Sequence, residues 1–514
     1  MVKAATLASQ FSPDELADFL DPQEHESTPP DDPALKLSLL NFISYLGCPQ
    51  EAYEAGRENI RLCYPDIEIL SHYRVSRMAR TLSGVVTWED HMCVNSCLGF
   101  TGPFAELEQC PECGESRYRE KELEDSGGET KIPRKVFSTF PAGPQLQARW
   151  KHAQTAKDMF YRWEKTQELH RERGVGLNEP LGLYDDILCG EAYLDAADDG
   201  RIGEYDTVLM LSIDGAQLHE SKESDCWIYI WIVVDLGPDK RYKIRNILPG
   251  GVIPGPKPPG DLDSFLFPGL AHVSALQQEG LPIWDAYHRK RALSFLFLLL
   301  VLADAVAMAK ISGSVGHHGR KGCRLLCGFT GRNKRHGSHY YPALLQPNGF
   351  GNHLTSYHAD VDVRLLPIPN PDEYKRDLYH IISSGSEAEY KRRRFNTGIG
   401  KPSIFDGIPR ILDLPTCFAG DLMHQPLINL ATLLLDLWCA RPGARDQDRS
   451  SVWPWAVLTG DVWIEHGKDV ERTARYLPTS FGRVPRNPQE KISSGYKASE
   501  LLYYIYGVGP AVFY

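Results

Sequence analysis

Three absences limit what this chain of 514 residues can be. Its most apolar stretch, Leu293–Ala303, is far shorter than the roughly 20 residues of a membrane-spanning helix. Its N-terminal segment contains no apolar core of the signal-peptide type. It also lacks an excess of positive charge, since its formal net charge is −11. We therefore expect no membrane partner and no general coating of positive charge for nucleic acid. A locally basic groove stays compatible with this balance, because charges act over about one Debye length.

The chain contains 12 cysteines. Because no secretion signal precedes them, they indicate a reducing compartment, where metal binding is favoured over disulfides. Four of them form two closely spaced pairs, Cys93 with Cys97 and Cys110 with Cys113. Four thiolates on two such knuckles satisfy tetrahedral Zn²⁺ and leave no open position for catalysis. We predict a structural zinc ribbon; the alternative is four unrelated cysteines in a reduced protein.

Two aspartates each close an apolar run. Thr207–Ile213 predicts a buried strand, and Asp214 follows it directly. A carboxylate at a strand end can project from a rigid support toward a metal ion. Asp304 closes Leu293–Ala303 in the same way. On residue type alone, Asp214 also suits a turn before Gly215, and Asp304 also suits a helix surface.

The region around Asp214 is rich in predicted strands. Cys226–Val234 and Tyr242–Leu248 follow Thr207–Ile213 at a spacing that suits an antiparallel meander. Pro249–Gly260 contains so many prolines and glycines that we expect neither a helix nor a central strand there. Asp263–Gly280 predicts a helix from its apolar periodicity. This part of the chain is therefore expected to be strand-rich, with a helix after the strands.

A segment rich in basic residues, cysteine and histidine follows Asp304. It either holds a second zinc ion or forms a basic surface loop with unligated cysteines. The zinc candidates are Cys323, Cys327, His336 and His339, and the phosphate-binding candidates are Arg320, Lys321 and Arg324. A second basic run suits a solvated helix face, a phosphate clamp or a nuclear import signal: Lys391, Arg392, Arg393 and Arg394.

The C-terminal part offers three more polar candidates. Asp421 and His424 are three residues apart, so both point to one side if the segment is helical; Asp421 also suits an ordinary helix start. Glu500 falls among apolar residues of a predicted amphipathic helix. By itself it also suits an ordinary exposed position on that helix. Its nearest competitor, Glu490, follows the turn-prone stretch 485–488.

Longer motifs are more specific than these single residues. IDGAQLHESK, CWIYIW, LPGGVIPGP, GHHGRKGCRLLCG and FGRVPRNPQEKISSGYKASE resemble the catalytic region of CACTA-type (En/Spm-like) DNA transposases, and the Cys93–Cys113 cluster resembles the one that precedes that region. The resemblance covers roughly residues 85–514. It implies a ribonuclease-H-like core with an Asp-Asp-Glu triad, which matches Asp214, Asp304 and Glu500. The family's Asp-x-x-His signature is matched by Asp421 and His424.

The resemblance also implies a chemistry and partners. Three carboxylates can hold two Mg²⁺ (or Mn²⁺) ions for cleavage of a phosphodiester and transfer of the freed 3′-hydroxyl to target DNA. The expected cofactors are therefore Mg²⁺ and Zn²⁺. The expected partner is double-stranded DNA at the element's terminal repeats and at the target, in the nucleus, and a homo-oligomer is compatible with this role. Such proteins commonly continue beyond the position of Tyr514, so we expect a copy truncated at its C-terminus. The alternatives are an inactive transposase-derived DNA- or protein-binding module and a nuclease that only hydrolyses.

The expected fold class is α/β: a ribonuclease-H-like mixed sheet with a large, mainly helical insertion, preceded by a small zinc ribbon and a helical N-terminal region. Six segments follow from it. They are a helical region with an acidic, proline-rich linker (1–84), the zinc ribbon (85–118), a helical connector (119–200), the first part of the core (201–330), the insertion (331–484) and the last core helix (485–514).

Overall fold

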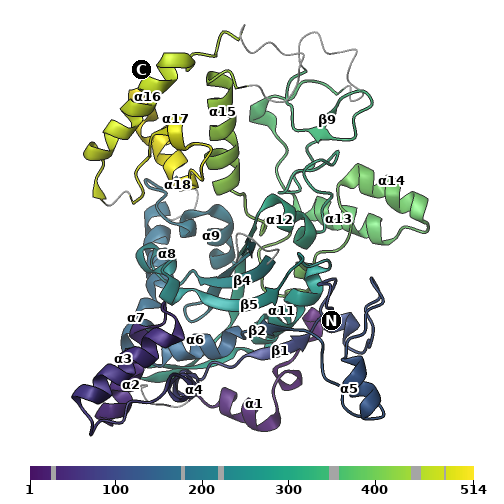
Figure 1. Cartoon of the computed structure of the whole chain (residues 1–514). Helices are drawn as coiled ribbons and strands as arrows, with labels where there is room; N and C mark the ends of the chain where they lie inside the picture. The colour runs from purple at the N-terminus through teal and green to yellow at the C-terminus, as the bar shows by residue number, and fades with distance from the viewer. Residues whose placement is uncertain are drawn as a thin grey trace. The chain divides into compact units, whose positions relative to one another are not determined.

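The computed structural model describes residues 1–22, 24, 31–174, 180–217, 225–346, 358–441, 453–479 and 482–513 (Figure 1). These residues form two compact units, Met1–Ala419 and Gly420–Tyr514, and each is described by itself. Within the described ranges, every helix is too short or too polar to cross a membrane.

The first unit is built on a mixed sheet of six strands. Their order is β1-β2-β5-β4-β3-β8. β3, β4 and β5 form an antiparallel meander, whereas β8 runs parallel to β3. The strands are β1 (Trp88–His91), β2 (Val136–Thr139), β3 (Thr207–Gln217), β4 (Asp225–Val233), β5 (Leu248–Pro254) and β8 (Leu296–Ala303). Two separate pairs are β6 (Leu281–Asp285) with β7 (Lys290–Ser294), and β9 (Arg332–Asn333) with β10 (Tyr340–Tyr341).

The third strand of the meander corrects the sequence prediction. Tyr242–Leu248 is not a strand, and β5 instead begins at Leu248 and runs through residues that we expected to exclude a strand. The sheet accommodates Pro249 because the register with β4 shifts at Ile230, its partner. The glycines are needed for packing, since a side chain at position 250 or 251 would overlap the ring of Tyr229. Proline and glycine here allow a close approach of backbone to an aromatic ring.

A long helix covers this sheet. α11 (Leu262–Glu279) packs against β2, β5 and β8, and it confirms the helix predicted over Asp263–Gly280. Asp261 caps its first turn, accepting a hydrogen bond from the Asp263 N–H at 3.0 Å. Leu293–Ala303 was expected as one element, but the chain divides it between β7 and β8. Buried side chains of α11 and the strands belong to one large core.

Further helices surround the sheet in the first unit. They are α1 (Pro13–Leu20), α2 (Pro33–Ser44), α3 (Gln50–Cys63), α4 (His72–Ser83), α5 (Glu120–Asp125), α6 (Ala142–Trp150), α7 (Ala153–Asp158), α8 (Tyr161–Arg173), α9 (Glu191–Asp198), α10 (Pro238–Arg241), α12 (Ala305–Ser312), α13 (Pro371–Ile382) and α14 (Glu387–Thr397).

The second unit is helical among its described residues. Its elements are the π-helix η9 (Met423–Leu430), α15 (Ala431–Trp438), α16 (Gly460–Thr473), α17 (Pro488–Lys491), α18 (Ala498–Leu501), the π-helix η13 (Leu502–Val508) and α19 (Gly509–Val512). A small core of its own holds these helices together, with Leu435, Val470 and Tyr504 at its centre.

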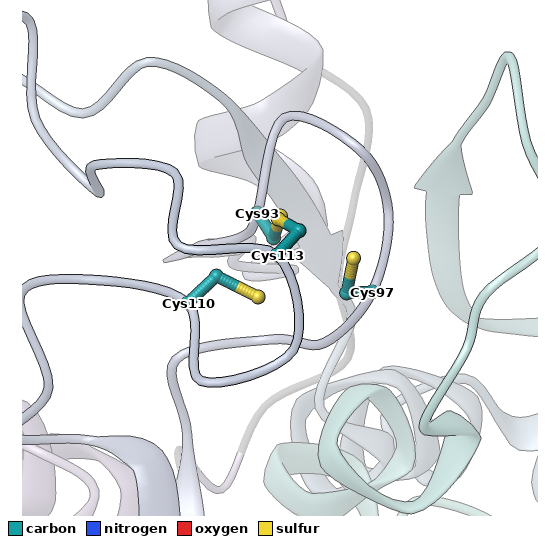
Figure 2. Close-up of side chains that lie close together, drawn as sticks. All are labelled: Cys93, Cys97, Cys110 and Cys113. Carbon is teal, nitrogen blue, oxygen red and sulfur yellow. The ribbon is translucent and has the colours of Figure 1, made fainter.

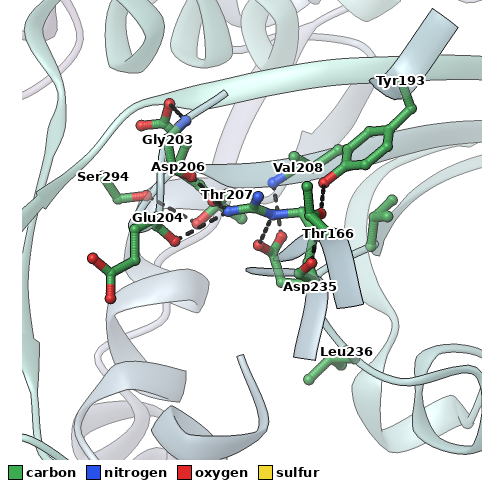
Figure 3. Close-up of polar contacts among 12 residues, drawn as sticks. Thr166, Tyr193, Gly203, Glu204, Asp206, Thr207, Val208, Asp235, Leu236 and Ser294 are labelled. Carbon is green, nitrogen blue, oxygen red and sulfur yellow. Dashed lines mark hydrogen bonds and ion pairs between the residues drawn. The ribbon is translucent and has the colours of Figure 1, made fainter. Parts of the chain in front are cut away.

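A buried ion pair fixes the start of β3. Arg162 of α8 is almost fully buried, and its Nε donates to Asp235 Oδ1 at 2.6 Å. Its Nη2 donates to the main-chain oxygens of Gly203, Glu204 and Asp206. Asp235 Oδ2 in turn accepts the Val208 N–H at 2.7 Å (Figure 3). One guanidinium therefore joins α8, the turn before β3 and the chain that follows β4.

Candidate active site and metal centre

Asp214 and Asp304 lie side by side on neighbouring strands. Asp304 directly follows β8, whereas Asp214 lies within β3, paired with Ile228 of β4, and so does not end the strand as predicted. In the parallel pair β3/β8, Ile213 lies opposite Ala303, and each aspartate is the next residue. Neighbouring strands lie about 4.8 Å apart. The two carboxylates therefore start from adjacent points on the same edge of the sheet, where polar groups from several strands can converge on one ligand.

The two aspartates have different surroundings. Asp214 is exposed, and its Oδ1 accepts the N–H of Gly215 at 2.8 Å. Asp304 is half-buried and is the N-cap of α12, where its Oδ1 accepts the Ala307 N–H at 2.7 Å. This hydrogen bond fixes the direction of the Asp304 side chain. The helix-surface interpretation of Asp304 is thus replaced by a cap at a strand-to-helix junction.

Two cations lie near Asp304: Arg324 was a phosphate-binding candidate from the sequence, whereas Lys310 was missed. Arg324 Nη2 donates to the main-chain oxygen of Ala303, the residue before Asp304, at 2.5 Å. Lys310 lies over the ring of Trp227 at 5.7 Å and interacts electrostatically with Asp304. Burial lowers the pKa of Lys310, and the charge of Asp304 opposes that change. Both cations lie where they could face a phosphate at this edge. For Lys310, the one signal in the sequence is that it follows Asp304 by six residues, in the helix that Asp304 begins.

Glu500 belongs to the second unit and is fully buried there. Arg486 binds it through two hydrogen bonds, Nε to Oε1 at 2.6 Å and Nη2 to Oε2 at 2.9 Å. The Lys497 N–H donates to Oε2 at 2.9 Å, as in a capping box. Burial raises the pKa of Glu500, but these hydrogen bonds outweigh it and the net pKa is lowered. The predicted helix is present, and the approach of Glu500 to Asp214 and Asp304 stays a prediction.

The second unit also contains the Asp-x-x-His pair. Asp421 Oδ1 accepts the His424 N–H at 2.9 Å, and Asp421 Oδ2 lies 2.8 Å from His424 Nδ1. The carboxylate thus closes the first turn of η9 and orients the imidazole. α18, which carries Glu500, packs against η9. Glu500 and the Asp421–His424 pair therefore lie on packed neighbours within this unit.

Four cysteines form the one candidate metal centre found in the described ranges. The sulfurs of Cys93, Cys97, Cys110 and Cys113 all lie within 4.8 Å of one another. Figure 2 shows their side chains pointing into one space between two turns. The Cys110 N–H donates to Glu115 O, and Gly114 adopts the positive φ of 76° that a tight knuckle needs. The predicted convergence is confirmed, and a set of four thiols of this kind could bind zinc.

The cysteine cluster is attached to the core. It is inserted between β1 and β2 of the main sheet. The Gly260 N–H donates to Ser96 O at 3.0 Å, and the Asp261 N–H donates to Cys97 O at 2.7 Å. Because Asp261 also caps α11, the first knuckle is joined to the start of the helix that covers the sheet. A metal here would stabilise the core itself.

The second Cys/His set is brought together only in part: the thiols of Cys323 and Cys327 interact, but they do not form a metal-binding group with His336 and His339. Among the described residues, the cluster at Cys93 is the one group close enough to hold an ion, and Cys323, Cys327, His336 and His339 do not form another. The rings that do gather belong to His317, His318 and His339: the first two are 4.0 Å apart, and His318 stacks on His339 at 4.1 Å. His317 and His318 belong to the same histidine-rich segment, but the predicted zinc set used His336 and His339 instead.

The two basic stretches meet in the first unit. Arg320 Nη1 donates to Asn396 Oδ1 at 3.0 Å and lies over the Phe395 ring at the end of α14. A side chain at position 398 would overlap Lys321, so this residue also adjoins the end of α14. Within α14 the charges are partly compensated: Lys391 pairs with Glu387 at 2.7 Å, and Arg393 pairs with Glu389 at 2.6 Å. The exposed side chains are those of Lys391, Arg392 and Arg394.

The chemical class that this sheet edge suits is metal-dependent phosphoryl transfer, since adjacent carboxylates are the ligands that divalent cations need. Residues 203–339 match the model of the transposase family tnp2. The matched range contains Asp214, Asp304 and the basic segment after Asp304, and the match supports a transposase family and a transposase role. No curated protein matches the chain.

Proposed function

We propose that the protein is a CACTA-type DNA transposase that cleaves and joins DNA at element ends with an Asp-Asp-Glu triad. The observation that carries the proposal is the placement of Asp214 and Asp304 on adjacent parallel strands inside the range that matches the transposase family. The proposed third acid is Glu500. The proposed partner is double-stranded DNA, and the proposed location is the nucleus, where such DNA lies.

The order of elements supports a ribonuclease-H-like core. A meander of three strands is followed by α11, by the separate pair β6 and β7, and then by β8, which is parallel to the first strand of the meander. On the free side of β8, parallel bridges join Leu298 to Ile411 and Val301 to Phe418. The chain at 411–418 thus occupies the place of a fifth strand. A large segment separates Asp304 from Glu500, as an insertion before the last acid requires.

The residues at the sheet edge fit a divalent cation. Asp214 is exposed and Asp304 is held in one direction by its cap, so both can present an oxygen to the same ion. Mg²⁺ held there would activate a water and neutralise charge on the phosphate. Lys310 and Arg324 lie beside Asp304 and suit the phosphate of a bound strand. His424, oriented by Asp421, is proposed as an auxiliary group.

The cysteine cluster is proposed to hold a structural zinc ion. The four thiolates could hold Zn²⁺ and would leave no open position on the ion for a substrate. The hydrogen bonds from Gly260 and Asp261 connect this ion to the start of α11. Zinc therefore supports the fold, and magnesium serves the reaction.

A second function is favoured by the ion pair of Glu500. A carboxylate that is buried against Arg486 contributes to stability without any metal. If Glu500 stays in this pair, the chain is a transposase-derived module that binds DNA or protein and does not cut. Asp214 and Asp304 would then still bind a cation, but strand cleavage would be absent.

The test uses DNA that carries the inverted repeats flanking the protein's own gene, with Mg²⁺ and the full chain. The proposed function predicts metal-dependent nicks at the repeat ends and joining of the freed ends to a target duplex. Asp304→Asn should abolish both steps while keeping the helix cap, since Asn is as good an N-cap as Asp. Cleavage without joining would instead indicate a nuclease. Activity that survives Asp304→Asn would contradict the proposed site.

A further inference from the structure

The N-terminal part contains a small helical unit whose role the catalytic site does not explain. α2, α3 and α4 (residues 33–83, here the three-helix unit) pack around their own small core. That core is centred on Tyr53, Leu70 and Val75, and it is separate from the large core of the sheet. Phe42 contacts Tyr53 edge-on at 6.1 Å. The unit therefore has the packing needed to present one of its helices rigidly.

Buried polar contacts fix the start of α4. Leu70 donates its N–H to Ser38 Oγ at 3.0 Å and accepts the Tyr53 hydroxyl at 2.8 Å, so it is tied to both α2 and α3. The His72 N–H donates to Glu54 Oε1 at 2.8 Å. Ser71 caps the helix. These contacts at the turn hold α4 in one orientation, as a helix that reads a partner's surface requires.

α4 has one buried face and one basic face. Val75 is fully buried. On the other side lie Tyr73, Arg77 and Arg80, spaced i, i+4 and i+7, and all three are exposed. The sequence of α4, HYRVSRMARTLS, contains three arginines and no acidic residue. This composition stands out in a chain whose formal net charge is −11.

The acids of the unit do not neutralise this face. Glu54 pairs with Arg57 at 3.1 Å and Glu58 with Arg61 at 3.2 Å, both within α3. Glu68 pairs with Arg74 at 2.9 Å, at the edge of the face. Within the described part of the chain, the guanidinium groups of Arg77 and Arg80 make no ion pair or hydrogen bond.

We propose that α4 binds duplex DNA through this basic face, as a contact separate from the catalytic acids. A helix fits the major groove, and unpaired arginines suit phosphates and the edges of guanine. α4 is the third helix of a compact unit, and contacts at its first turn fix it to the other two helices. DNA-binding helices are commonly presented by two supporting helices in this way. Tyr73 adds a hydroxyl that can contact the backbone. The occupant is duplex DNA.

The test compares full-length variants in magnesium-free buffer, so that the result does not depend on catalysis. Arg77→Gln/Arg80→Gln removes two exposed charges, and Lys36→Gln/Arg61→Gln removes two from α2 and α3 as a matched control. Binding to a fluorescent duplex is measured by anisotropy at several salt concentrations. For the α4 variant we expect about a tenfold loss of affinity and a salt slope smaller by about 1.8, since each phosphate contact contributes about 0.9. The control should keep both values.

Three results would overturn the proposal. Equal affinity and slope in the α4 variant and the native chain would show that α4 does not touch DNA. An equal loss in the control would indicate only general electrostatics. Unchanged duplex binding with lost binding to polyglutamate would assign the face to an acidic protein. A chain that never cuts DNA but shows the predicted loss would uphold α4 binding and refute the catalytic proposal, so the two can be distinguished.

Discussion

Asp214 and Asp304 lie side by side at one edge of the sheet, because the residues before them, Ile213 and Ala303, are partners in a parallel strand pair. The relationship joins two positions far apart in the sequence. It depends on the register of β3 and β8, and a shift by one residue would turn one carboxylate to the other face. The buried Arg162–Asp235 pair secures the beginning of β3 and so supports this register.

Removal of one cysteine should release zinc and weaken the first unit. The native chain should retain about one zinc ion, and Cys110→Ser should lose it, because three thiolates no longer close the tetrahedron. Metal analysis and the thermal unfolding midpoint measure this. Cys48→Ser, at an exposed cysteine outside the cluster, is the control and should change neither. A native chain that holds no zinc and does not respond to a chelator would contradict the prediction.

The Arg162–Asp235 pair should matter for stability only when it is broken on one side. Arg162→Met leaves Asp235 charged and buried, which should cost about 3–5 kcal/mol in the free energy of unfolding. Arg162→Met/Asp235→Leu should recover part of this loss, since no isolated charge remains. Denaturant unfolding gives both values. Arg61→Met, in an exposed pair, should have little effect. A double variant less stable than Arg162→Met would refute this account.

His272 should make the first unit sensitive to acid. It is fully buried between the Gly143 N–H, which donates to Nε2 at 3.1 Å, and Gln10 Oε1, 2.8 Å from Nδ1. Burial lowers its pKa to about 3, so the unfolded chain binds a proton below pH 6.5 that the folded chain does not. Stability should fall by about 2 kcal/mol between pH 6.5 and 5.

His272→Gln should reduce this pH dependence, whereas His380→Gln, at an exposed position, should leave it unchanged. The unfolding midpoint in denaturant is measured from pH 5 to 7. An identical slope in the native chain and in His272→Gln would show that His272 is not the group that titrates.

Arg486 should stabilise the second unit through Glu500. Arg486→Gln should lower its thermal unfolding midpoint at neutral pH, because a buried carboxylate loses two hydrogen bonds. The lowered pKa of Glu500 means that this stabilisation is present above the unfolded value near 4.5 and is lost as pH falls through the folded value. The two chains should therefore converge in acid. Glu490→Gln, at an exposed glutamate, should not change the unfolding midpoint. A large effect of this variant would show that Glu490, and not Glu500, stabilises the unit.

Short-range chemistry could be predicted from the sequence. Cysteine spacing identified the cluster at Cys93, because knuckle geometry is local. The apolar run Thr207–Ile213 correctly predicted the buried part of β3, but the strand was expected to end there and instead continues past Asp214 to Gln217. The meander was expected, but its third strand was misplaced, because proline and glycine are not expected in a central strand. Here a register shift at Ile230 accommodates Pro249, and the ring of Tyr229 packs against two glycines.

Pairing between distant residues could not be predicted. Nothing near Glu500 in the pattern of apolar residues shows that Arg486 will bind it. The basic face of α4 was overlooked for the same reason, since its charges matter only once Glu54 and Glu58 are seen to pair within α3. Spacing also selected His336 for a metal set, whereas the chain folds His318 against His339. Such partners are chosen by tertiary packing.

The central claim is that Asp214 and Asp304 share a divalent cation, and Mn²⁺ titration followed by electron paramagnetic resonance tests it most directly. The full chain is compared with Asp214→Asn, with Asp304→Asn, and with Asp239→Asn, an exposed control of equal charge change. We predict that each site variant weakens Mn²⁺ binding by at least about tenfold, because the ion loses one of its charged oxygen ligands, while the control binds like the native chain. Native affinity in either Asp214→Asn or Asp304→Asn would contradict the shared site.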